Sequence, residues 1–336
     1  MKSYIICGTP RSGSTLLCDV LAATKAAGAP DSFFMRDVDP VWARAWDLPE
    51  RSDLSDAAYG AAYLAAAIKA GSGQTGVFGL RLMRENLGDV ARMIDAVYPG
   101  LASDRARLRA AFGEVLFVHL TRADKLAQAV SLIKAEQTGL WHIGPDGVEL
   151  ERLSPSQQPQ YDFARIRARV AELEGYDEAW LHWFAAQGIA PLRIEYDSLS
   201  ADPVAEVARI CAALGVAEPV AGSLRPGVEK LADAVSADWM RRYWLDLAAQ
   251  VLACGRGCSA VGLDFSGGVC GEVRHLLTGM LWHSGLDICA NVKAGAVFCI
   301  DIILNISILL IYLHALHDVT MAALSRRVWR GCARSL

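Results

Sequence analysis

Residues 4–17 read YIICGTPRSGSTLL, and this stretch decides the fold. Residues 4–7 form a short apolar run, residues 8–15 are rich in glycine, serine and threonine, and apolar residues then recur at positions 16, 17, 20 and 21. The last spacing is helical, so the stretch predicts a strand, a tight turn and a helix whose amino end faces the turn. Backbone N–H groups at such a helix end form a cradle for anions.

The turn has the spacing of the phosphate loop G-x-x-x-x-G-K-[ST], with Gly8 and Gly13 at the two glycine positions. Ser14 stands where that motif has lysine. Because the lysine reaches the β- and γ-phosphates of a nucleotide, its replacement disfavours NTP hydrolysis and kinase activity. Arg11 offers instead a planar, permanently charged guanidinium that suits a phosphate or a sulfonate.

Strands and helices alternate along the rest of the first 250 residues. Apolar runs predict strands at residues 77–82, 115–120 and 191–196, and helical spacing predicts helices at residues 53–69, 123–136, 166–187 and 204–214. This alternation predicts an α/β fold in which helices cover both faces of a parallel sheet.

Composition excludes several classes of protein. With 336 residues, 53% of them apolar and 21% charged, the chain is neither mainly disordered nor a collagen-like repeat nor a small disulfide-rich protein. The net charge of −4 provides no general basic field, so nucleic acid is not an expected partner. A local pocket of arginines can still bind an anionic ligand.

The composition changes near Gln250. All the prolines lie before this residue, whereas most of the cysteines lie after it, and the charge balance changes from negative to positive. We therefore predict a domain over residues 1–250 and a divergent, cysteine-rich, apolar tail over residues 251–336. The tail is expected to be dispensable for ligand binding, and it is consistent with either an added segment or an out-of-register reading of the gene's end.

Residues 294–316 are long and apolar enough to span a bilayer, although Asp301 interrupts them. A membrane-associating segment and a buried or misassigned helix are both consistent with this pattern. At the other end, the apolar run is too short for a secretory signal. The expected location is the cytoplasm, with membrane association through the tail as an alternative.

The first stretch and several later ones together resemble the Stf0-type bacterial sulfotransferases, which include trehalose 2-sulfotransferase. The similar segments are residues 4–17, 27–34 (AGAPDSFF), 76–83 (GVFGLRLM), 119–122 (HLTR), 180–184 (WLHWF) and 231–243. They occur in the family's order over residues 4–244 and stop at the compositional break. The resemblance implies the three-layer α/β/α architecture of the phosphate-loop-like sulfotransferases and a homodimer.

The resemblance also implies the donor, 3′-phosphoadenylyl sulfate. It assigns the 5′-phosphosulfate to Arg11, Ser12, Gly13, Ser14 and Thr15, and the 3′-phosphate to Arg122 and Ser131. The residues support this pairing, because Arg122 ends the strand predicted at residues 115–120 and Ser131 lies in the following helix. Both can therefore reach the carboxyl edge of the sheet, where open α/β sheets bind ligands. The alternative is a surface arginine and an ordinary helical serine.

The acceptor implied by the family is a hydroxyl of a carbohydrate or glycolipid. In trehalose sulfotransferase a glutamate after the Gly-x-Pro turn deprotonates it, and Ser32 occupies that position here. We predict that the adjacent Asp31 is the general base, with a cap or turn role as the alternative and His142 as a second candidate. Neighbours in an extended segment point to opposite faces, so Asp31 needs a local shift to take the role.

Three further predictions concern ligands and function. Trp141 is a candidate sugar-stacking platform or, equally, a core tryptophan, and residues 35–75 and 143–162 are candidate acceptor loops. The tail's cysteines and histidines have zinc-ligand types without a recognised spacing, so no metal is expected. A small-molecule kinase and a catalytically weak, membrane-attached nucleotide-binding protein are the alternative functions.

Overall fold

A computed structural model of the chain describes residues 2–35, 39–219, 227, 231 and 233–259. Residues from Met1 to Gly257 form one compact unit. The tail segment 294–316 and the cysteine cluster after residue 260 lie outside the described residues. The division of the chain after residue 250 therefore stays a prediction.

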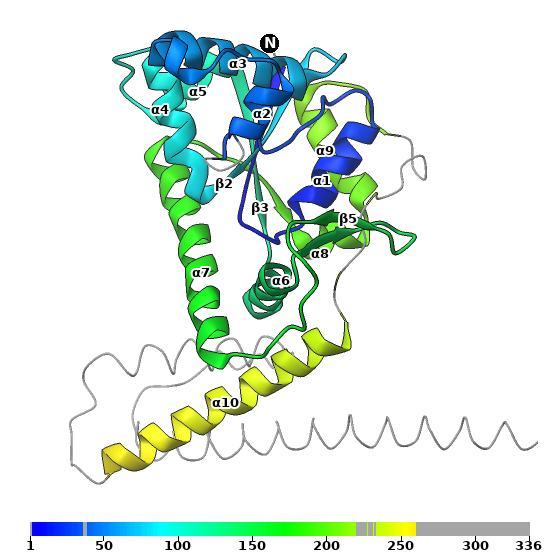
Figure 1. Ribbon diagram of the computed structural model, residues 1–336, viewed down its shortest axis with the longest axis vertical. Coiled ribbons are helices and arrows are strands. Elements are labelled where there is room, and N and C mark those ends of the chain that lie inside the picture. Colours follow the sequence, from blue (N-terminus) through cyan, green and yellow to red (C-terminus); the bar gives the residue numbers. More distant parts are fainter. Residues whose placement is uncertain (1, 36–38, 220–226, 228–230, 232, 260–336) are drawn as a thin grey trace, which may run out of the picture. The chain divides into compact units, whose positions relative to one another are not determined.

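Four parallel strands make the central sheet, in the order β2-β1-β3-β6 (Figure 1). They are β1 (Lys2–Gly8), β2 (Val77–Met83), β3 (Glu114–Thr121) and β6 (Leu192–Glu195), which confirms the four strands predicted from the apolar runs. Gly8 of β1 pairs with Met83 of β2, and Cys7 pairs with His119 of β3. The carboxyl ends of these three strands therefore meet at one edge of the sheet.

Side chains of β1 alternate between two apolar clusters, one on each face of the sheet. Ile5 and Cys7 pack with α3 (Asp56–Ser72), α4 (Leu87–Val97), α5 (Asp104–Phe112) and α7 (Phe163–Ala186). Tyr4 and Ile6 pack with α1 (Ser14–Ala23), α8 (Tyr196–Ala201) and α9 (Pro203–Leu214). Since successive residues of a strand face opposite sides, this alternation builds two cores from one strand. The predicted three-layer α/β/α architecture is confirmed.

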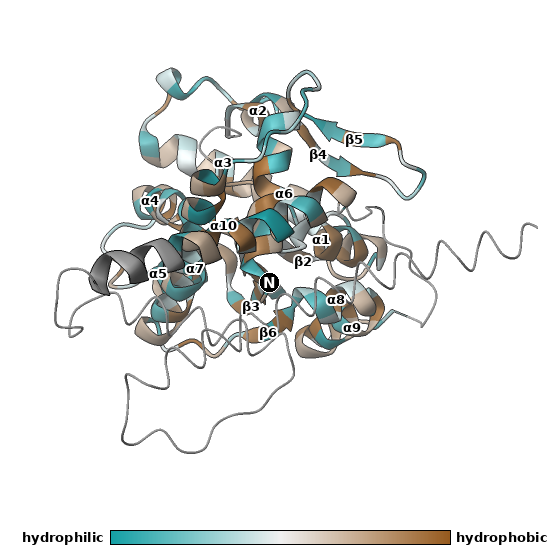
Figure 2. Ribbon diagram, turned by 90° about the horizontal axis from the view of Figure 1, so that it is seen from below, coloured by the Kyte–Doolittle hydropathy of each residue, from teal (hydrophilic) through white to brown (hydrophobic). Residues whose placement is uncertain are grey.

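A two-stranded antiparallel hairpin lies beside the sheet. The sequence analysis predicted a loop for residues 143–162 and no strand here. Its strands are β4 (Leu140–Ile143) and β5 (Glu149–Arg152). Figure 2 shows that β5 and the turn before it are hydrophilic. The strands of the sheet are mostly buried instead. The hairpin follows α6 (Lys125–Thr138), which ends at Gly139 with a positive φ of 71°. Arg152 Nη1 fastens the hairpin by donating to the carbonyl of Thr138 at 2.6 Å.

The short helices α2 (Asp39–Ala45), η1 (Arg51–Asp53) and η2 (Arg84–Asn86) complete the connections before α10 (Ala234–Ser259). Helix α10 continues through Gln250, so the compositional break does not coincide with a linker. Its Tyr243 ring stacks on Phe163 at 5.1 Å, and Tyr161 Oη donates to Asp246 Oδ2 at 2.6 Å. None of the helices within the described ranges has the length and apolar character that a bilayer span requires.

The packing of α10 predicts which of its residues stabilise the unit. Trp239 is 3% exposed, whereas Leu245 on the same helix is 51% exposed. Trp239→Ala should lower the free energy of unfolding by about 3–5 kcal/mol, the usual cost of removing a buried aromatic side chain. Leu245→Ala should change it by no more than about 0.5 kcal/mol. Urea denaturation of the two variants measures both, and equal effects would show that α10 does not belong to the folded unit.

Candidate active site

The loop between β1 and α1 is held in a tight conformation. Gly13 has a φ of +91°, and a Cβ placed on it would lie 2.6 Å from Cδ2 of Tyr196. Only glycine fits this position, because both the backbone region and the space exclude a side chain. The hydroxyl of Ser12 is buried and has no hydrogen-bond partner within the described part of the chain. The predicted anion cradle therefore contains a polar atom that a ligand can satisfy.

Arg11 connects this loop to α6 and to the hairpin. Its Nε donates to Ser131 Oγ at 3.1 Å, and its Nη1 donates to the carbonyl of Trp141 at 2.8 Å. Arg122 contacts the backbone of Arg11, because its Nη1 donates to the Arg11 carbonyl at 3.3 Å. The guanidinium of Arg122 lies 4.4 Å from the centre of the Tyr196 ring. The structure thus brings Arg11, Ser131 and Arg122 together.

The electrostatics of this cluster favour an anion. Burial, followed by the positive charge of Arg122, lowers the pKa of Arg11 to about 10. Among the described residues, neither arginine takes part in an ion pair with a carboxylate. Two neighbouring guanidinium groups without a paired carboxylate form a site where a phosphate or sulfonate binds favourably.

A second cluster centres on Arg81 of β2, which the sequence analysis did not identify. Its three nitrogens donate to three different residues: Nε to Ser32 Oγ at 2.7 Å, Nη1 to Thr15 Oγ1 at 2.9 Å and Nη2 to Asp31 Oδ1 at 3.1 Å. Arg81 is the one charged residue in the strand VFGLRLM. A lone arginine near the carboxyl end of an otherwise apolar strand was the signal that could have revealed it.

Asp31 and Ser32 both contact Arg81, although an extended segment would point them to opposite faces. The chain turns here, because the Phe33 N–H donates to the Asp31 carbonyl at 3.2 Å and the Ser32 N–H donates to Asp31 Oδ1 at 2.7 Å. Such an i to i+2 bond marks a tight three-residue turn. The turn therefore places Asp31 and Ser32 on the same side, and the role of Asp31 as the general base stays a prediction. Its carboxylate is 47% exposed, whereas Ser32 is buried.

His142 of β4 lies against the same loop. Its Nε2 is 3.2 Å from Thr15 Oγ1 and 3.4 Å from Glu151 Oε2 of β5. Burial, with the charges of Arg11 and Arg81, lowers the pKa of His142 to about 4. The imidazole is therefore neutral near pH 7.

Two other residues shape the site. Gln128, which the sequence analysis did not identify, donates from Nε2 to Thr9 Oγ1 at 2.8 Å and to the Pro10 carbonyl at 2.6 Å, so it anchors the loop from α6. The Trp141 ring is half-buried and packs against Ala129, Leu132 and Leu173. Its backbone carbonyl, rather than its ring, contacts Arg11. Within the described ranges, no three His, Cys, Asp or Glu residues form a group that could hold a metal ion.

The packing of Tyr196 against Gly13 can be tested by substitution, with Gly76 as the control position. Both glycines have a positive φ, but a Cβ on Gly76 would meet nothing within 4 Å. Gly76→Ala should cost about 1–2 kcal/mol of stability, from the left-handed backbone alone. Gly13→Ala should cost a further 1–3 kcal/mol or so, because the Tyr196 ring has to move. Thermal denaturation compares the two variants, and equal losses would contradict this packing.

Comparisons of the amino-acid sequence with known proteins agree on one family. The chain is 31% identical over 261 residues to trehalose 2-sulfotransferase of Mycobacterium tuberculosis, covering 72% of this chain and 94% of that protein. It is 28% identical over 268 residues to trehalose 2-sulfotransferase of Mycolicibacterium smegmatis, covering 73% and 95%. A solved sulfotransferase from Alicyclobacillus acidocaldarius aligns with 79% of this chain and 98% of its own, at 14% identity and a TM-score of 0.37. The family model of the Stf0 sulphotransferases matches residues 3–246, and the chain belongs to this family.

Proposed function

We propose that this protein transfers a sulfuryl group from 3′-phosphoadenylyl sulfate to a hydroxyl of a carbohydrate or glycolipid. The observation that carries the proposal is the cluster of Arg11, Arg122 and Ser131, where two arginines lie beside a glycine-rich loop without a paired carboxylate. The family membership of the chain supports the class of reaction.

The residues of the cluster fit the two anionic ends of this donor. Arg11 and the loop residues Ser12, Gly13, Ser14 and Thr15 would hold the 5′-phosphosulfate, whose oxygens would satisfy the buried hydroxyl of Ser12. Arg122 and Ser131 would hold the 3′-phosphate. When bound, the donor supplies a sulfuryl group on a phosphate leaving group.

The protein's part in the reaction is mainly positioning and charge stabilisation. As the acceptor oxygen bonds to sulfur and the bond between sulfur and the 5′-phosphate oxygen breaks, Arg11 would stabilise the charge on the departing phosphate. Asp31 would accept the proton of the acceptor hydroxyl. Its ion pair with Arg81 fixes its orientation, and its exposure leaves it accessible to an acceptor.

The acceptor would approach between the Asp31 turn and the segments predicted as acceptor loops. The first of these contacts the site directly, because Trp42 Nε1 of α2 donates to the Ser32 carbonyl at 3.0 Å. We propose that the part of the Trp141 ring that packing leaves exposed contacts the acceptor. The two relatives named trehalose 2-sulfotransferase support a carbohydrate acceptor. The homodimer remains a prediction from the family.

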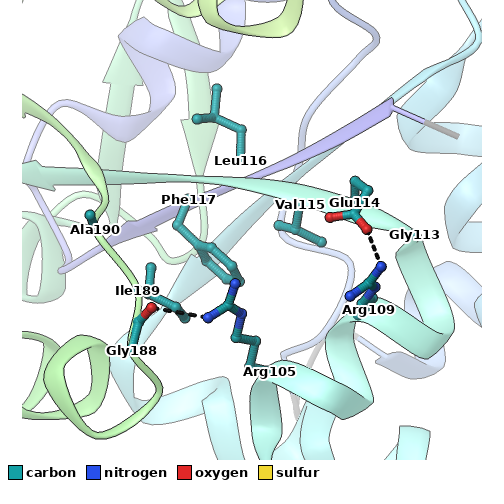
Figure 3. A pocket seen from close by; sticks show the side chains of 10 residues that line it. All are labelled: Arg105, Arg109, Gly113, Glu114, Val115, Leu116, Phe117, Gly188, Ile189 and Ala190. Atoms are coloured by element: carbon teal, nitrogen blue, oxygen red, sulfur yellow. Dashed lines mark hydrogen bonds and ion pairs between the residues drawn. The ribbon is translucent and has the colours of Figure 1, made fainter.

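Arg122→Ala should weaken binding of adenosine 3′,5′-bisphosphate by about 1.5–3 kcal/mol, or roughly 10- to 150-fold, because a buried charged hydrogen bond is lost. Arg105→Ala is the matched control. Arg105 donates to the Gly188 carbonyl at 3.0 Å beside a cavity of about 170 Å³ at the amino end of β3, the opposite edge of the sheet from the loop (Figure 3). Calorimetry measures both affinities.

Unchanged affinity of Arg122→Ala would remove Arg122 from the 3′-phosphate site. The same titrations with ATP distinguish the kinase alternative. Tighter binding of ATP than of adenosine 3′,5′-bisphosphate by the unchanged protein would overturn the proposed donor.

Asp31→Asn should lower turnover by about 10²–10⁴-fold, the usual effect of removing a general base, and leave donor affinity nearly intact. Asparagine keeps an oxygen for Arg81 and for the Ser32 amide, so the turn is preserved. Asp238→Asn is the control, because Asp238 of α10 is also paired with an arginine and is 45% exposed, close to the 47% of Asp31. A sulfate-transfer assay with labelled donor measures turnover, and full activity of Asp31→Asn would exclude Asp31 as the base.

A further inference from the structure

His142 lies one hydrogen bond away from the last hydroxyl of the loop. Its Nε2 is 3.2 Å from Thr15 Oγ1, which also accepts from Arg81 Nη1 at 2.9 Å. Because Arg81 donates into this oxygen, the proton of the Thr15 hydroxyl is available for Nε2. In the neutral tautomer that carries its proton on Nδ1, the imidazole therefore accepts from Thr15 through Nε2.

An anion on the loop would change this arrangement. A hydroxyl has a single proton, so Thr15 cannot donate to an anionic oxygen and to His142 at the same time. Nε2 would then lose its donor in a half-buried place, with Glu151 Oε2 at 3.4 Å and the anion as its neighbours. Both neighbours are acceptors, so Nε2 has to carry a proton, which either the neutral Nε2–H tautomer or the imidazolium supplies.

The charges around His142 decide whether the imidazole is neutral or positively charged. Arg11 and Arg81 face it from the loop and from β2, and together with burial they lower its pKa to about 4. Glu151 faces it from β5, where the neighbouring Glu149 and Arg152 pair with each other. On α6, which packs against β4, Lys134 pairs with Asp233, and Glu136 pairs with Arg165 and Arg169. An anion bound to Arg11 offsets the charges that keep the imidazole neutral. The carboxylate of Glu151 and the anion then both stabilise the imidazolium over the neutral Nε2–H tautomer.

We propose that His142 binds the 5′-phosphosulfate end of the donor as an imidazolium, and that donor binding therefore takes up a proton on this residue. The inference rests on the proposed function, since it needs an anion on the loop. It adds a third cation to the site and makes donor affinity increase as the pH falls. Affinity increases at lower pH because the bound protein holds more protons than the free protein.

The test is calorimetry of adenosine 3′,5′-bisphosphate with the full chain, in buffers of different ionisation enthalpy between pH 5.5 and 8. The phosphates of this ligand also titrate, but they contribute equally to the unchanged protein and to His142→Gln. The unchanged protein should take up more protons than His142→Gln. Its affinity advantage should grow as the pH falls, by up to about tenfold for each unit between the bound and free pKa values. His182→Gln, at an exposed position on α7, should match the unchanged protein.

NMR titration of the histidine ring nitrogens follows His142 in the unchanged protein, so the test does not depend on a variant that folds poorly. A higher pKa of His142 in the complex than in the free protein supports the proposal. Equal proton uptake by the unchanged protein and His142→Gln, or an imidazole that stays neutral in the complex, overturns it while the donor site stands. Failure of the unchanged protein to bind the ligand overturns the donor site as well.

Discussion

The guanidinium of Arg11 holds together three segments that are far apart in the sequence. It extends from the loop after β1, contacts Ser131 of α6 and binds the backbone of β4. Its own backbone has a φ of 61°, a region that residues other than glycine seldom adopt and that costs of the order of 1–3 kcal/mol. The surrounding contacts hold this conformation, so the cation is in place before a ligand arrives. The other features of the site are arranged around it.

Arg81 joins segments in the same way on the proposed acceptor side. It joins the candidate base, Asp31, to Thr15 of the loop through one planar group. Because Thr15 also contacts His142, hydrogen bonds run without interruption from the Asp31 turn to the hairpin. A change in the hydrogen bonds of Thr15 therefore affects both Arg81 and His142. This hydroxyl therefore couples the proposed donor half of the site to the proposed acceptor half.

The parts of the fold that the sequence predicted are those with strong local patterns. The buried strands are continuous apolar runs, so β1 and β3 could be located within two residues or so of their ends. Strand β5 has no such signal, because most of its residues are exposed. Arg11 was singled out from the loop motif, whereas the resemblance to the sulfotransferases assigned Arg122 and Ser131. The places of these two residues at a strand end and in the next helix only supported that assignment. The contacts of Arg81 depend on the register that sets it beside Ile6, and those of Asp31 depend on the turn at Phe33. Neither can be read from spacing alone.

The pairing of Arg11 with Arg122 has a consequence for stability. Two like charges held close together in a largely buried place oppose folding of the free protein, and no carboxylate among the described residues pairs with either of them. A ligand that neutralises them removes this repulsion, so part of its binding energy appears as resistance to unfolding. The protein therefore keeps a less stable resting state in exchange for affinity, the trade between stability and activity that functional sites commonly show.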